Sequence, residues 1–107
     1  MLTFKRTSEN NFALFDDEKE IAWVQTDGNL IKNVTYEDEK TNARYGDFTL
    51  RSIAYALRNH NAEIKSAFYD ERLERIGFEK THDGMKANAL KINFDTCCCQ
   101  KGEKSEN

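Results

Sequence analysis

Proline is absent from this chain of 107 residues. Neither slow proline isomerisation nor a rigid proline-rich linker can therefore be part of its behaviour. Long hydrophobic runs are absent too, and no window approaches the roughly 20 apolar residues of a membrane-spanning helix. The first residues lack the basic stretch and apolar run of a secretory signal. These absences lead us to expect a cytoplasmic protein without a membrane partner.

An excess of positive charge is also missing. The chain has 16 lysine and arginine residues against 19 aspartate and glutamate residues, which gives a formal net charge of -3. Nucleic-acid binding depends on a concentrated basic face that neutralises phosphates. We therefore expect no nucleic-acid partner, although the composition leaves room for a local basic groove.

Separated cysteines are absent as well, because all three cysteines are adjacent at Cys97, Cys98 and Cys99. A disulfide-stabilised secreted domain needs an even number of spaced cysteines, so this cluster favours a reducing compartment. Structural zinc sites use separated ligand pairs, and His60 and His82 have no suitable partner spacing. We expect no metal site. A redox or metal role for the cysteines and simple packing of reduced thiols both stay open.

The hydrophobic residues that are present, 38% of the chain, suffice for one core. A chain of this size buries close to two-thirds of its surface when it folds. We expect a single domain over residues 1–96 and a polar, flexible tail over residues 97–107.

The first 37 residues have the pattern of a β-meander, with short apolar stretches separated by polar turns. Asp27 and Gly28 form a dipeptide that tolerates the positive φ angles of a tight hairpin turn. The expected strands are Leu2 to Thr7, Phe12 to Phe15, Ile21 to Gln25 and Leu30 to Glu37.

The periodicity changes after residue 45. Apolar residues then recur at i, i+3, i+4 and i+7, the spacing of one face of an α-helix. Asp47 stands where its side chain can cap the free amides of a first turn. We expect this long helix to span Asp47 to Asn61. The apolar residues are Leu50, Ile53, Ala54 and Leu57.

The rest of the chain predicts a strand, a short helix and a hairpin. The strand covers Glu63 to Ala67, and the helix covers Asp70 to Ile76 and ends at Gly77, since glycine adopts a left-handed cap without steric cost. Phe78 to Thr81 and Met85 to Phe94 form the closing hairpin. The whole pattern predicts an α+β or α/β domain with a mixed, mostly antiparallel twisted sheet and two helices.

Two segments within this order of elements are similar to motifs of a known protein family. Tyr45 to Leu57 (YGDFTLRSIAYAL) looks like the start of an acetyl-CoA-binding helix, and Leu73 to Lys80 (LERIGFEK) looks like a YEKLGF segment. Together with the order of strands and helices over Glu20 to Phe94, they resemble the GNAT superfamily of N-acetyltransferases. The resemblance implies a GNAT-like domain, an acetyl-CoA cofactor and transfer of an acetyl group to an amine.

In that family the loop before the long helix carries Q/R-x-x-G-x-G/A, and its free backbone amides hold the pyrophosphate of coenzyme A. Thr41, Arg44 and Gly46 fall at the three signature positions, and only Gly46 matches. Arg44 could itself contact a phosphate. The cofactor-binding residues that the resemblance implies are Thr41, Arg44, Tyr45, Gly46 and Asp47.

The family's general acid is frequently the tyrosine of YEKLGF, a position that Leu73 occupies here. Tyr69, one helical turn earlier, is the nearest substitute, with packing at a strand end as the alternative. Glu37 ends the strand that leads into the loop, where the family can place a general base with a pKa near the working pH. The alternative for Glu37 is a solvated turn shared with Asp38 and Glu39.

Two functions follow from these matches and departures. The first is an acetyl-CoA-binding N-acetyltransferase that acts on an unknown amine. The second is a non-catalytic interaction or regulatory module that keeps the fold without coenzyme binding. The family also places two helices between its first strands, for which Ser8 to Asn11 is too short. The acceptor side is then open, or another chain completes it, as in a homodimer.

The strands Leu30 to Glu37 and Glu63 to Ala67 should be parallel neighbours, because a helical crossover joins them. We expect them to separate at their C-terminal ends, where ligands of open α/β sheets lie. The sequence therefore predicts one cleft surrounded by Tyr36, Glu37, Arg44, Gly46 and Tyr69.

Overall fold

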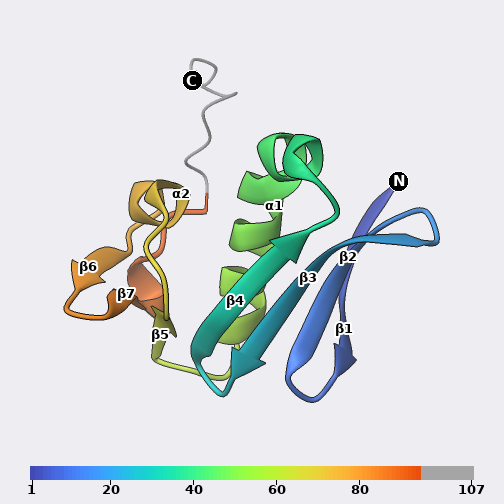
Figure 1. The fold of residues 1–107 in the computed structure, drawn as a ribbon. Helices are drawn as coiled ribbons and strands as arrows, with labels where there is room; N and C mark the ends of the chain where they lie inside the picture. The colour runs from blue at the N-terminus through green and yellow to red at the C-terminus, as the bar shows by residue number, and fades with distance from the viewer. Residues whose placement is uncertain (95–107) are drawn as a thin grey trace, which may run out of the picture.

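A computed structural model describes residues 1–94, which form one seven-stranded sheet, two α-helices and a 3₁₀ turn (Figure 1). The predicted α+β class with a mostly antiparallel sheet is confirmed, whereas the predicted tail and its three cysteines lie outside the described residues. The sheet has the order β1-β2-β3-β4-β5-β7-β6. The strands are β1 (Leu2–Ser8), β2 (Asn11–Asp16), β3 (Lys19–Asp27), β4 (Leu30–Tyr36), β5 (Glu63–Ser66), β6 (Glu79–Thr81) and β7 (Gly84–Asn88). The helical elements are α1 (Glu39–Arg58), α2 (Glu71–Arg75) and η1 (Ala89–Lys91).

The first four strands form the predicted antiparallel meander. Ala22, Val24 and Thr26 alternate along β3 on its buried side, while Trp23 and Gln25 are exposed on the other side. This alternation is the period-2 pattern of a strand with one face on the core and one face in water. The tight turn after β3 has Gly28 at φ 62°, as the Asp-Gly sequence predicts.

The predicted bounds of the long helix, Asp47 to Asn61, are wrong. The helix α1 begins at Glu39 and ends at Arg58. Asp38 is the N-cap, and its carboxylate accepts hydrogen bonds from the backbone N and the Oγ1 of Thr41, both at 2.8 Å. Asp47 therefore lies inside the helix. The hydrophobic periodicity did not predict the first two turns, because the residues that they bury, Thr41 and Gly46, are not large apolar residues.

The predicted parallel pairing of β4 and β5 is confirmed, and it is short. The paired residues are Leu30 with Lys65 and Ile31 with Ser66, after which β4 continues to Tyr36 without β5 beside it. In the register with β3, Lys32 is an extra residue between Ile31 and Asn33. Such a bulge bends a strand and increases its twist, which is consistent with the separation of β4 from β5 at this point.

The second half of the chain packs α2 and the β6–β7 hairpin against the same core as α1. Leu50 and Ile53 of α1, Leu73 of α2 and Met85 of β7 are all buried in one apolar cluster. The last predicted strand is too long, because β7 ends at Asn88. The Asn88 side chain accepts a hydrogen bond from Leu90 N at 2.9 Å and starts η1, so the chain leaves the sheet there.

None of the helices within residues 1–94 is long and apolar enough to cross a membrane.

Candidate functional site

A cleft opens where β4 and β5 part, and we call it the β4 cleft. Its volume is about 360 Å³, within the range of sites that bind small molecules. Polar and apolar side chains from four segments meet in it. They include Val34 and Tyr36 of β4, Asn42 and Leu50 of α1, and Asp70 and Arg72 at the start of α2.

One wall of the β4 cleft is a strand edge. The amide of Glu37 donates to the Ile21 carbonyl on β3, so the peptide groups of the alternate residues Val34 and Tyr36 point away from β3. No strand within residues 1–94 pairs with this side of β4 beyond Ile31. The cleft therefore offers backbone donors and acceptors to an extended ligand.

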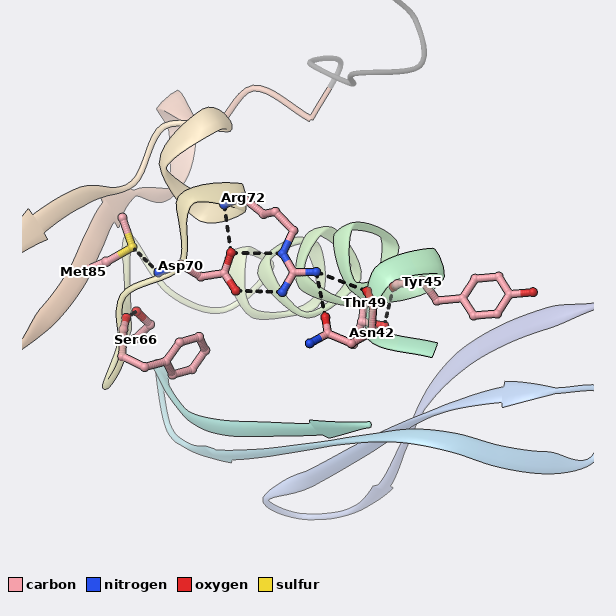
Figure 2. Close-up of polar contacts among 8 residues, drawn as sticks. Asn42, Tyr45, Thr49, Ser66, Asp70, Arg72 and Met85 are labelled. Atoms are coloured by element: carbon pink, nitrogen blue, oxygen red, sulfur yellow. Dashed lines mark hydrogen bonds and ion pairs between the residues drawn. The ribbon is translucent and has the colours of Figure 1, made fainter. Parts of the chain in front are cut away.

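The opposite wall is a polar bridge between the two helices, shown in Figure 2. The Arg72 guanidinium donates from Nε to Asp70 Oδ1 at 3.0 Å and from Nη2 to Asp70 Oδ2 at 2.8 Å, a bidentate ion pair. Its Nη1 reaches across to α1 and donates to Asn42 Oδ1 at 2.9 Å. Asp70 is also the N-cap of α2, since it accepts from Arg72 N at 2.8 Å. The bridge ties the start of α2 to the second turn of α1.

Burial and charge act in opposite directions on these groups. Desolvation raises the pKa of Asp70, but the hydrogen bonds and charge of Arg72 outweigh it, so the pKa lies below its ordinary value. Burial raises the pKa of Tyr36, and the nearby Arg72 offsets part of that rise. Asp70 is thus ionised at neutral pH and neutralises Arg72, so this guanidinium is not free to bind an anionic ligand. The other basic side chain that lines the cleft is Lys32, which is exposed on β4.

Gly46 lies inside α1 under this bridge. A Cβ at Gly46 would lie 1.9 Å from Arg72 Nη1 and 2.7 Å from Asn42 Oδ1. The missing side chain of Gly46 therefore allows Arg72 of the same chain to lie close to the helix backbone.

The other predicted cofactor residues all belong to the first turns of α1 and have partners within the chain. Thr41 bonds to the capping Asp38, and Asp47 forms an ion pair with Arg51 at 2.8 Å. Arg44 stacks on the Tyr45 ring, and Tyr45 packs against the apolar cluster around Leu14. Because α1 begins at Glu39, the amides from Ala43 to Asp47 are internal to a helix and are not those of an open loop.

The two predicted catalytic residues do not line the β4 cleft. Glu37 pairs with Lys19, whose Nζ lies 2.6 Å from Glu37 Oε2. Tyr69 is half exposed, and its hydroxyl donates to Glu74 Oε1 at 2.7 Å, which raises the pKa of Tyr69. Leu73, at the position where the resemblance implies a tyrosine, is completely buried. Of the five residues expected around one cleft, only Tyr36 is among those that line it, and Gly46 lies directly beneath its polar bridge.

Sequence reasoning missed the residues that dominate the cleft, namely Asn42, Asp70 and Arg72. One signal was available, because aspartate before a short helix is a typical N-cap. The distance of 30 residues between Asn42 and Arg72 carried no local signal of their contact.

Within residues 1–94, no group of three or more histidine, cysteine, aspartate or glutamate side chains could hold a metal ion. Compared with models of protein families, with curated proteins and with solved structures, the chain matches none.

Proposed function

We propose that this chain is a non-catalytic binding module with a GNAT-like arrangement of elements and without the coenzyme site of that family. The observation that carries the proposal is the position of α1, which begins at Glu39 with Asp38 as its cap. A pyrophosphate would need free amides at Arg44 to Asp47. These amides donate hydrogen bonds within the helix instead.

Electrostatics at the actual start of α1 supports the same conclusion. Asp38 occupies the cap, and Glu37 and Glu39 flank it. The hydrogen bond from Thr41 N lowers the pKa of Asp38, so its carboxylate is ionised at neutral pH. A negatively charged pyrophosphate would have to displace this carboxylate and approach two more, which repel it.

The positions of the expected catalytic groups also support a binding role. Leu73 lies fully within the core, and Tyr69 and Glu37 are engaged by Glu74 and Lys19 outside the cleft. A general acid and a general base need to reach one reacting group. These side chains do not converge on a common point in the β4 cleft.

The acetyltransferase function is the second candidate, and one observation favours it. The separated β4 edge and its cleft of about 360 Å³ can take an extended chain with amide groups, such as the pantetheine arm of acetyl-CoA. Acetyl transfer to an amine would then use Tyr36, which lines the cleft, in place of Tyr69.

Isothermal titration of the full chain with acetyl-CoA and with coenzyme A separates the two candidates. The proposed binding module gives no heat and no thermal shift at about 1 mM ligand, whereas a site with a Kd of about 10 µM would add roughly 2.7 kcal/mol of stability. Pantetheine without its nucleotide serves as the matched control for the cleft alone. Saturable binding of acetyl-CoA by the unchanged chain would overturn the proposal.

A further inference from the structure

An aromatic groove lies along α1, away from the β4 cleft. The residues that line it include Phe4 of β1, Phe94 after η1, and Phe48, Arg51 and Tyr55 of α1, and its volume is about 490 Å³. Phe48 is 42% exposed and Tyr55 is 53% exposed, so large rings meet solvent on this surface. The folding of residues 1–94 leaves this apolar area uncovered.

The charge of the groove is opposite to that of the whole chain. None of its lining residues is a carboxylate, although the chain carries a net charge of -3. At its rim the Arg58 guanidinium lies 4.7 Å from the centroid of Tyr55 and 5.1 Å from that of Phe94. Arg58 forms no ion pair within residues 1–94, whereas Arg51 has Asp47 on one side and donates to the Phe94 carbonyl. The groove thus combines aromatic rings with a cation that has no carboxylate partner in the described part of the chain.

The four α1 residues that carry this chemistry follow a heptad-like spacing. Phe48, Arg51, Tyr55 and Arg58 are separated by three, four and three residues, so they lie along one line of the helix. The two aromatic residues are seven positions apart, as are the two arginines. Seven residues correspond to about 10 Å of rise in this helix and in any helix laid along it.

We infer that the aromatic groove docks an amphipathic helix of a partner protein that carries apolar and acidic residues at heptad spacing. Apolar side chains seven residues apart meet Phe48 and Tyr55, and a carboxylate beside them meets Arg58, which has no ion pair within residues 1–94. The inference rests on the proposed binding role and adds the class of partner. Charge complementarity selects an acidic partner, because a basic helix would face Arg58 without compensation.

The probe is a fluorescein-labelled helical peptide of about three heptads, with leucine at the core positions and glutamate beside them. Fluorescence anisotropy with the full chain should give a Kd of about 10–100 µM at low salt, and binding should weaken as salt screens the charges. The same peptide with lysine at every glutamate position should bind at least about tenfold more weakly.

Two exposed positions test the surface without threatening the fold. Tyr55→Ser and Arg58→Glu should each weaken binding of the acidic peptide by about tenfold or more. Trp23→Ser on β3 and Arg75→Glu on α2 remove an exposed ring and an exposed arginine elsewhere, and they should leave the affinity unchanged. Circular dichroism checks that all four variants are folded.

Four outcomes overturn the inference: no binding of the acidic peptide at about 1 mM, equal binding of the lysine peptide, equal losses in the control variants, or tighter binding of an oligothymidylate than of the peptide. A change of solution mass in Tyr55→Ser, with unchanged peptide affinity, would instead identify the groove as a contact between two copies. If any of these results is found and the coenzyme titrations show no binding, the groove assignment fails while the non-catalytic proposal is retained.

Discussion

Replacing Gly46 by alanine should destabilise this protein, although the same change stabilises most helices. Alanine inside a helix is more favourable than glycine by about 1 kcal/mol. At Gly46 the new methyl group would lie 1.9 Å from Arg72 Nη1, so the guanidinium would have to move. The substitution therefore sets helix propensity against the polar bridge.

The contacts that would break determine the expected size of the loss. Moving the guanidinium breaks the hydrogen bonds from Arg72 Nη1 to Asn42 Oδ1 at 2.9 Å and to Asn42 O at 3.3 Å. The shorter of these is a hydrogen bond from a charged donor, of a kind that contributes about 1.5–3 kcal/mol, and the longer contributes little. After subtraction of the helix gain, Gly46→Ala should lower the free energy of unfolding by about 1 kcal/mol.

In an Arg72→Ala background the sign should reverse. The obstacle is gone, and the Asn42 side chain can rotate away, so Gly46→Ala should then stabilise by about 0.5–1 kcal/mol. Urea unfolding of the four proteins, followed by far-UV circular dichroism and by the fluorescence of Trp23, measures both effects. Equal effects of Gly46→Ala in the two backgrounds would show that Arg72 does not lie over Gly46. The assignment of this glycine to an internal contact would then fail.

Local patterns predicted each of the first four strands to within two residues at each end, whereas β7 was predicted too long. The Asp27-Gly28 turn and the alternation along β3 each depend on neighbouring residues, which a sequence displays directly. The short helix α2 was predicted to within one residue at each end because Asp70 and Gly77 are strong terminal signals.

The start of α1 was missed although its signal is local, because the capping Asp38 is followed by turns that bury polar and small residues. The contents of the cleft were missed because they depend on tertiary contacts. Thr41 and Thr49 are buried, and their hydroxyls have partners there, Asp38 for Thr41 and the Tyr45 carbonyl for Thr49. Both are polar residues that a search for apolar periodicity ignores. Arg72 is still harder to predict, because its role depends on reaching a helix 30 residues away.

Three further predictions concern the residues that decide the function. Asp70→Asn keeps a good helix cap but removes the ion pair, so it should cost about 2 kcal/mol in urea unfolding at pH 7, between the values for exposed and fully buried pairs. The folded-state pKa of Asp70 is depressed, so this contribution to stability is present above the ordinary aspartate pKa of about 3.9 and is lost as the pH falls through the lower folded value. The free energies of unfolding of wild type and variant should therefore become equal in acid. Leu73→Tyr, which introduces the family's tyrosine, should lower stability by about 1–3 kcal/mol by overpacking the core, and a variant as stable as wild type would contradict the burial of Leu73. Finally, the amides of Ala43 to Asp47 should exchange with D2O as slowly as those at the centre of α1, because each donates within the helix, whereas the uncapped amides of its first turn should exchange fast. NMR resolves these amides individually. Fast exchange at Ala43 to Asp47, as in a loop, would place the start of the helix near Asp47. Free amides would then be present for a pyrophosphate, and the acetyltransferase would be favoured over the binding module.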